Sequence, residues 1–487
     1  MLRRLVCISI FLVAMLFAHH SLAQSFKEYE RQMNARFGAF QTQADKQYED
    51  FYREVNARYA DFMRREWTRA EEQPAIPAPA PNPPVPPKFD PQAPVRPQAE
   101  LPLSEILRPV VTPKPTPVRP IPVETQPDNT IAFTFFGAEC EVRGDEADFT
   151  TKMSDCKEAS VAKYWQLLSD GRTNALINDC LTLREELQLC DWAYYQLAKN
   201  ISAKIYGDDT CNEAIVMQTY ILTQSGYKVR IGRTEEELRV LLSSDSTIYS
   251  TTYLYIGGVQ FYLLQGTKGK PVFICDFEFP GESIFSMKID KLPKLPVNEI
   301  AGRELQAHKY SNTKVQINHN QNIIDFLNTF PLCSIDNYTT ASLDDEAKKA
   351  LYPVLQAAIN NMPEDVMANI LINFVQTAFE YKVDGEQFGR ERTLFANETL
   401  YYPYSDCEDR ALLFATLVRE LMGLDVVLLD YPDHIATAVH FTQDIQGDYM
   451  TIDGMKYLIC DPTYVGANIG KCMPSYMEVA AGIIKIE

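Results

Sequence analysis

The chain has 487 residues, of which 46% are hydrophobic and 23% are charged, so it can bury two ordinary cores and leave a long additional segment. Its formal net charge of −19 argues against a nucleic-acid-binding protein, because phosphate backbones select basic surfaces. The composition predicts two globular domains, further segments and no nucleic-acid partner.

The first 23 residues have the parts of a secretory signal. Arg3 and Arg4 form a basic start, an apolar run follows from Leu5 to Phe17, and small residues precede a cleavage point after Ala23. The run is shorter than the ~20 residues that a spanning helix needs, and no later stretch is apolar enough to span a bilayer. Residues 1–23 are therefore predicted to be a removed signal peptide, so the mature chain is expected in the periplasm or cell envelope, or secreted.

Ten of the 11 cysteines follow this signal. An oxidising compartment permits disulfides, for example Cys140 with Cys156 or Cys180 with Cys190, although the spacing leaves the connectivity open. If one cysteine is kept as a reactive thiol, an odd number remains, so at least one more is expected to be unpaired.

Residues 24–72 contain an 11-residue repeat that starts at Phe26. Its first position is aromatic in every copy, at Phe26, Phe37, Tyr48 and Tyr59, and its fourth is aromatic at Tyr29, Phe40, Phe51 and Phe62. These spacings place the rings on one stripe of an amphipathic helix that stays nearly straight. Exposed rings need a cover, so this helical arm is expected either to pack on its own protein or to self-associate in a coiled-coil-like manner or dock on an envelope partner.

Residues 73–129 form a proline-rich linker, with 19 of the chain's 30 prolines between Pro74 and Pro127. Polyproline II geometry, at about 3.1 Å per residue, would make it a semi-rigid spacer between the arm and the globular body. Recognition by a proline-binding partner is the alternative.

The globular part is predicted to comprise residues 130–300, a connecting segment over residues 301–343, and residues 344–487. The first unit is expected to hold a strand at IAFTFFG, helices around Val161 to Leu168 and Ala193 to Lys204, and strands after Ile248. The second is expected to hold two helices, a longer helix after Ser405, and the strands VVLLD, HIATAVHF, YMTID and YLICD. Helices that precede strands in both units predict an α+β fold.

Cys407 is expected in the first turn of that longer helix, with Ser405 or Asp406 as N-cap and Gly423 as the stop. Free backbone N–H groups and the positive end of the helix dipole favour a thiolate there. The neighbouring acids Asp406, Glu408 and Asp409 oppose it. A basic partner is therefore required.

His434 begins the strand HIATAVHF, and Asp461 follows the strand YLICD. A cysteine, a histidine and an aspartate supply a nucleophile, a general base and a carboxylate that orients the base. The segment from about Tyr402 to Tyr464 resembles the transglutaminase-like, papain-related thiol superfamily: Cys407 in DCEDRA, His434 in DHIATAV and Asp461 in DPTY match the family's order and context.

The resemblance implies a papain-like or transglutaminase-like core and acyl transfer through a thioester. It covers roughly 60 residues directly and about 140 with the helices from Asp345 onward. Family members commonly have an aromatic residue two places after the histidine, whereas this chain has Ala436. The resemblance therefore does not define the acceptor side of the pocket.

Other readings of these residues remain. His440 shares strand parity with His434 and is the second candidate base. Cys407, His434 and Asp461 could instead bind zinc together with Cys460, although no close metal-binding pair supports this. For the oxyanion hole, the backbone N–H of Cys407 is the natural donor, and Tyr402 or Tyr404 is either a second donor or a packing residue.

Residues 130–300 contain a related pattern without a histidine. Cys211 precedes Gly226 much as Cys407 precedes Gly423, and KPVFICDFEFPG aligns Cys275 and Asp276 with Cys460 and Asp461. No histidine occurs between His20 and His308, so this unit lacks the base. It is predicted to be a degenerate transglutaminase-like domain kept for packing or substrate binding, and chance similarity is the alternative.

The predicted function is thiol-dependent acyl transfer or hydrolysis on a peptide or protein amide in the envelope, without a metal or organic cofactor. Hydrolysis is preferred over cross-linking because water is the default acceptor where no amine site is evident. The alternative is a non-catalytic envelope interaction protein whose domains are binding modules.

Overall fold

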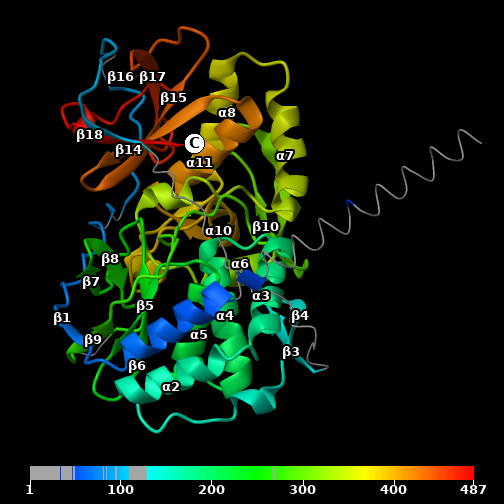
Figure 1. Ribbon diagram of the computed structural model, residues 1–487. Coiled ribbons are helices and arrows are strands. Elements are labelled where there is room, and N and C mark those ends of the chain that lie inside the picture. Colours follow the sequence, from blue (N-terminus) through cyan, green and yellow to red (C-terminus); the bar gives the residue numbers. More distant parts are fainter. Residues whose placement is uncertain are drawn as a thin grey trace, which may run out of the picture.

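The computed structural model describes residue 33 and residues 46–47, 50–80, 82–83, 85–93, 96–108, 129–266 and 269–486. The predicted signal peptide, most of the first two arm repeats and linker residues 109–128 lie outside these residues. Figure 1 shows two lobes, each with a sheet and packed helices, and with the candidate site in the upper, C-terminal lobe. The predicted α+β class is confirmed.

The first lobe begins with a hairpin and four helices. The hairpin strands are β3 (Thr130–Phe135) and β4 (Ala138–Arg143), and the helices are α2 (Glu158–Leu168), α3 (Asn174–Glu186), α4 (Asp191–Tyr206) and α5 (Asn212–Gln224). A six-stranded antiparallel sheet follows in the order β1-β9-β5-β6-β8-β7. Its strands are β1 (Thr68–Ala70), β5 (Val229–Arg233), β6 (Leu238–Ser243), β7 (Tyr253–Ile256), β8 (Val259–Tyr262) and β9 (Val272–Cys275). The strand predicted at IAFTFFG and the helices predicted around residues 161–168 and 193–204 are confirmed.

A short connecting region joins the lobes. It consists of the antiparallel pair β10 (Glu299–Leu305) and β11 (Val315–Asn320), followed by α6 (Gln321–Leu327). Short 3₁₀ turns lie at Glu146–Phe149, Ser311–Thr313, Ile335–Tyr338 and Pro474–Tyr476.

The second lobe packs helices on a six-stranded sheet of order β16-β17-β15-β14-β18-β2. Its helices are α7 (Asp345–Ile359), α8 (Glu364–Thr377), α9 (Asp384–Gln387), α10 (Ala396–Tyr401) and α11 (Cys407–Met422). The sheet strands are β2 (Leu103–Leu107), β14 (Asp425–Tyr431), β15 (His434–His440), β16 (Tyr449–Ile452), β17 (Met455–Cys460) and β18 (Ala481–Lys485), and a small parallel pair joins β12 (Glu380–Tyr381) to β13 (Tyr404–Ser405). The helices and strands predicted after residue 344 are confirmed.

The described part of the arm packs on its own protein. Residues 50–63 are helical, and Tyr59 is almost fully buried, with its ring 4.5 Å from that of Trp165 and 4.8 Å from that of Phe279. Trp165 Nε1 donates to Asn56 Oδ1 of the arm at 3.0 Å. Of the two predicted outcomes, packing on the first lobe holds for these residues, while Phe51 stays 49% exposed.

The expectation of a linker that separates arm from body is wrong for its described residues. Gln73 forms a β-bridge with Tyr253 at the start of β7 in the first lobe, and residues 103–107 pair in parallel with β18 in the second sheet. Leu101 is buried against Leu429 and Ile483 on the face of the second sheet that α11 does not cover. The segment lies along both lobes because some apolar residues between its prolines, such as Leu101, are buried there.

The two sheets differ in strand order, which bears on the predicted duplication. In the second lobe β15, the second strand after the helix, pairs with the strand of Cys460. In the first lobe β5, the first strand after the helix, pairs with the strand of Cys275. Cys211 caps α5, whereas Cys407 is the first residue of α11. The duplication remains a prediction, and the strand order gives it no support.

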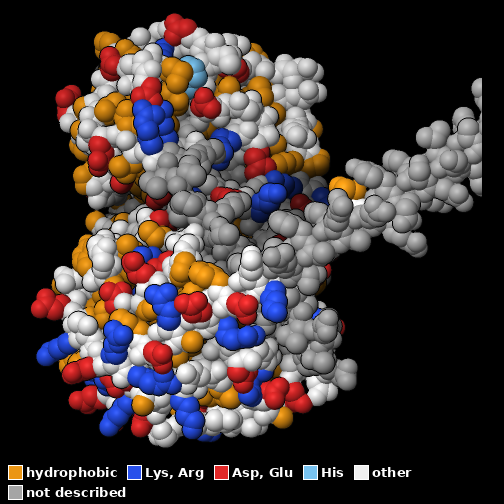
Figure 2. Space-filling view, in the orientation of Figure 1, with side chains coloured by type: hydrophobic (Ala, Val, Ile, Leu, Met, Phe, Trp, Pro, Cys, Tyr) orange, Lys and Arg blue, Asp and Glu red, His pale blue; other side chains and the backbone are white. Residues whose placement is uncertain are grey.

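All ten cysteines after the predicted signal are free thiols, so neither disulfide considered from the sequence is formed. On the face shown in Figure 2, acidic and basic side chains are interspersed. Among the described residues, no helix combines the length and apolar character that a bilayer span requires.

Candidate active site

Cys407 is the first residue of α11, as predicted. Asp406 is the N-cap in an extended conformation, and Gly423 ends the helix with φ of 67°, a left-handed conformation that glycine adopts without strain. The helix packs apolar side chains such as Leu412 and Leu417 into the main core, which fixes where it begins. Cys407 is consequently buried, with its relative exposure at 0%.

Strand pairing brings His434 and Asp461 together. His434 opens β15 opposite Tyr431 of β14, and Thr437 pairs with Cys460 at the end of β17. Asp461, the next residue, therefore lies beside the start of β15. Its Oδ2 is 2.9 Å from His434 Nε2, and both side chains are buried. The predicted base and carboxylate thus meet as expected.

The carboxylate of Asp461 is held from its other side as well. Its Oδ1 accepts the backbone N–H groups of Thr463 at 2.9 Å and Tyr464 at 3.2 Å. With Oδ1 fixed by two donors, Oδ2 is left to accept a hydrogen bond from the imidazole. This favours the tautomer with hydrogen on Nε2, which leaves Nδ1 free to accept a proton.

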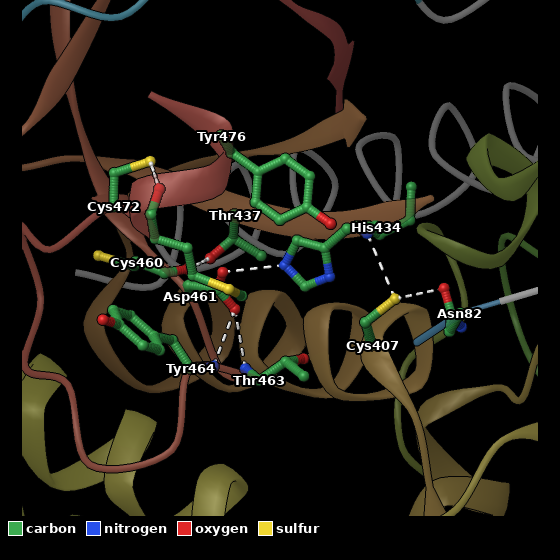
Figure 3. A network of polar contacts seen from close by, with 12 residues as sticks. Asn82, Cys407, His434, Thr437, Cys460, Asp461, Thr463, Tyr464, Cys472 and Tyr476 are labelled. Carbon is green, nitrogen blue, oxygen red and sulfur yellow. Dashed lines mark hydrogen bonds and ion pairs between the residues drawn. The ribbon is translucent and has the colours of Figure 1, made fainter. Parts of the chain in front are cut away.

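The sulfur of Cys407 lies on the other side of the imidazole. Figure 3 shows the ring of His434 between Asp461 and Cys407, with Nδ1 on the side of the thiol. The backbone N–H of Ile435 donates to Sγ at 3.3 Å. The thiol itself donates to Oδ1 of Asn82 at 2.7 Å, so in this arrangement its hydrogen is directed away from the ring.

The surroundings of the thiol favour its neutral form. Burial raises the pKa of Cys407 well above its usual value, and the adjacent carboxylates Glu408 and Asp406 raise it further, while the Ile435 N–H acts in the opposite direction. The sequence predicted that the start of the helix would favour the thiolate and that the acidic neighbours would oppose it. In this conformation burial and the acidic neighbours outweigh the helix start, and the pKa of the thiol is raised.

Two tyrosines that the sequence did not single out cover the imidazole. The ring of Tyr476, in the 3₁₀ turn Pro474–Tyr476, stacks on that of His434 with centroids 5.1 Å apart and planes 19° apart. Tyr431 lies in contact with Tyr476 at 4.7 Å. The Tyr476 hydroxyl donates to Asp433 at 2.9 Å, which anchors this cover. Stacking restricts rotation of the imidazole about its χ2 angle.

Gln376 of α8 fixes the loop that carries Asp461. Its side-chain amide donates to the carbonyls of Asp461, Tyr464 and Ala467 at 3.2, 2.9 and 3.1 Å, and its oxygen accepts the N–H of Gly466 at 3.2 Å. A buried amide with all of these partners is a positioning group. No local pattern in the sequence marks it.

Five acidic groups gather beside the start of α11. Carboxylate oxygens of Asp384, Asp406 and Asp409 lie within 4.8 Å of one another, as do those of Asp384, Glu391 and Glu408. Burial, followed by the charge of Asp406, raises the pKa of Asp384 to about 8 and that of Glu391 to about 7. Carboxyl groups this close and this buried must be neutralised by shared protons or by a cation, and oxygen ligands of this type suit Ca²⁺ or Mg²⁺.

The residues of the alternative interpretations, zinc binding, a second base and a tyrosine donor, make other contacts. Among the described residues, Cys407, His434, Cys460 and Asp461 do not form a group with metal-binding geometry, so the zinc reading is not supported. His440 Nδ1 contacts the Lys456 carbonyl at 2.9 Å. The Tyr402 hydroxyl donates to Asn328, and the Tyr404 ring lies under the Lys382 ammonium.

Comparison of the chain with protein-family models, with curated proteins and with solved structures gives no match in any of the three.

Proposed function

We propose that this protein is an exported thiol-dependent acyl transferase or hydrolase that acts on peptide or protein amides, with a transglutaminase-like, papain-related core in its second lobe. The observation that carries the proposal is the buried 2.9 Å contact of His434 Nε2 with Asp461 Oδ2, on a ring whose other nitrogen faces the thiol at the start of α11. That arrangement supplies a nucleophile, a base and an orienting carboxylate.

The proposed reaction begins when His434 Nδ1 takes the proton of Cys407 and Sγ attacks the carbonyl carbon of the amide. Collapse of the tetrahedral adduct breaks the C–N bond, and the imidazolium returns its proton to the leaving amine. A thioester remains on Cys407. Water, deprotonated by the same imidazole, then attacks it and releases the carboxylic acid and the thiol.

Asp461 has a positioning part in this scheme, because it keeps hydrogen on Nε2 and stabilises the imidazolium after proton transfer. The oxyanion would be met by the backbone N–H of Cys407, at the positive end of the α11 dipole. The imidazolium also compensates for Glu408 and Asp406, which oppose a thiolate on its own.

A second candidate function is a non-catalytic envelope interaction protein. It is favoured by the state of Cys407, which is buried, has a raised pKa and donates to the protein's own Asn82. The predicted export and the predicted partner of the arm rest on residues outside the described ones and stay predictions.

Alkylation of Cys407 by iodoacetamide, followed by mass spectrometry, separates the two functions. In the enzyme, His434→Ala should slow alkylation of Cys407 about tenfold or more, because the base that generates the thiolate is lost. His440→Ala is the matched control, since it lies on the same strand and its ring contacts the Lys456 carbonyl and the Tyr457 ring. Equal rates in the wild type and His434→Ala would favour the interaction protein.

The acceptor can be determined with casein and dansylcadaverine. Ammonia release from casein without fluorescent labelling would indicate hydrolysis of side-chain amides, and labelled casein would indicate transamidation. Cys407→Ser should abolish either activity, whereas Cys211→Ser in the first lobe should leave it unchanged. Activity that survives Cys407→Ser would refute the assignment of the nucleophile.

A further inference from the structure

A short stretch of the proline-rich segment lies across the candidate site. We define the capping segment as residues 82–83 and 87–89. At one end Asn82 contacts Cys407, and the carbonyl of Pro83 accepts the Tyr381 hydroxyl at 2.7 Å. At the other end Phe89 N–H donates to the Val465 carbonyl and Val465 N–H donates to the Pro87 carbonyl, both at 3.0 Å.

These contacts place the capping segment between the two sides of the site. Tyr381 stands next to the start of α11, and Val465 belongs to the loop that follows Asp461. The Phe89 ring meets the Tyr464 ring edge-on, with centroids 5.7 Å apart. One end of the segment thus contacts the thiol, and the other contacts the loop that carries the orienting carboxylate.

The capping segment is poor in backbone donors, because Pro83 and Pro87 have no N–H to donate. Val85, between its two parts, is 69% exposed. Proline also restricts the unbound chain to extended conformations, which lowers the entropy cost of occupying such a site.

Asn82 is the residue of the segment that suits the thiol chemically. Its Oδ1 accepts the Cys407 thiol, and its Nδ2 donates to the Glu408 carboxylate. The proline side chains around it could do neither. An ionised carboxylate at this position would have no hydrogen to donate to the Glu408 carboxyl, so the site is expected to prefer an amide over an acidic side chain.

We propose that the capping segment occupies the binding track of this site and blocks it, and that the site's substrates are extended polypeptide segments that pair with Val465 and present an uncharged carbonyl oxygen at Cys407. The inference deepens the proposed function and rests on it. While the capping segment is bound, Asn82 Oδ1 lies beside Sγ of Cys407, where the substrate's carbonyl group would have to lie. Turnover therefore requires that the capping segment leave.

Iodoacetamide alkylation of Cys407 in the full chain tests the block. Asn82→Ala removes the amide oxygen that accepts from the thiol and the amide N–H that donates to Glu408, and it should accelerate alkylation on the order of tenfold. Phe89→Ala loosens the far end and should accelerate it in the same direction. Val85→Ala is the matched control, because that side chain points to solvent, and its rate should equal that of the wild type.

A separate peptide tests whether the capping segment occupies the track that binds the substrate. PAPNPPVPPKFDP, which reproduces residues 79–91, should slow alkylation of Cys407 in the Asn82→Ala chain, and the same peptide with Asp in place of its Asn should not. Protection by both peptides would overturn the specificity for an uncharged group. Unchanged alkylation in both Asn82→Ala and Phe89→Ala would overturn the block.

Adding His434→Ala to the Asn82→Ala chain distinguishes failure of the block from failure of the proposed function. If Asn82→Ala accelerates alkylation and the added His434→Ala does not slow it, the block stands and the proposed function fails. If Asn82→Ala has no effect while His434→Ala slows alkylation, the proposed function stands and the block fails.

Discussion

Replacing Asp461 with asparagine should disable the thiol while leaving the fold in place. The amide has two possible orientations. With its Nδ2 toward Thr463 and Tyr464, it would set a donor against the two N–H groups that Oδ1 now accepts at 2.9 and 3.2 Å. The amide is therefore expected to keep its oxygen there and turn Nδ2 toward His434.

That orientation reverses the tautomer of His434. Nε2, which now lies 2.9 Å from a carboxylate oxygen, would have to accept from the amide, so the ring hydrogen would move to Nδ1. A protonated Nδ1 cannot take the proton of Cys407. The comparable loss of tautomer in an acyl-transfer triad lowers turnover by about 10⁴-fold. The lost charge-assisted hydrogen bond should lower the free energy of unfolding by about 1.5–3 kcal/mol.

The assay is the rate of Cys407 alkylation by iodoacetamide between pH 5 and 9, with urea unfolding measured in parallel. Asp433→Asn is the matched control, since Asp433 lies beside His434 in sequence and accepts the Tyr476 hydroxyl, which an amide oxygen can also accept. A rate for Asp461→Asn within twofold of the wild type across this pH range would refute the tautomer argument.

Two further outcomes concern stability. The pKa of Asp384 is raised to about 8 from about 3.9 in an unfolded chain. The folded protein thus retains a proton that the unfolded chain releases, so this contribution to stability is full below about pH 4 and is lost as the pH rises toward 8. Asp384→Asn should flatten the fall of the melting temperature between pH 5 and 8, and an equally steep fall would contradict this. Tyr59→Ala should lower the free energy of unfolding in urea by about 3–5 kcal/mol, because its ring is buried against the first lobe. The control Phe51→Ala, at a half-exposed ring of the same helix, should change it by no more than about 0.5 kcal/mol, and equal effects would refute packing of the arm.

Most of the second lobe's secondary structure could be predicted from local sequence patterns. The helix that begins at Cys407 was predictable because an N-cap, an apolar periodicity and a glycine stop at Gly423 all act within a few residues. The strands that carry His434 and precede Asp461 were predictable from continuous runs of β-branched and aliphatic residues. These features depend on neighbours in the chain.

The contacts that complete the site could not be predicted in this way. Asn82 lies 325 positions from Cys407, and its neighbours are prolines that suggest only a spacer. Gln376 and Tyr476 stand in segments whose patterns indicate a buried helix and a loop, and nothing nearby in sequence shows what they touch. The clustering of Asp384 with the acidic residues at the start of α11 could not be predicted either, because only the acidic run DCED is local in the sequence.

The sequence by itself determined the α+β class and the positions of the helix and strands around the candidate site, because these follow from the periodicity and capping of short segments. The three side chains proposed for the site were predicted from a resemblance to a thiol superfamily. The tertiary structure decided that the linker lies on both lobes, that the thiol donates to Asn82 and that the neighbouring carboxyl groups are buried together. These outcomes depend on long-range packing, where burial in a low-dielectric interior sets the state of a thiol or an acid more strongly than its own residue type does.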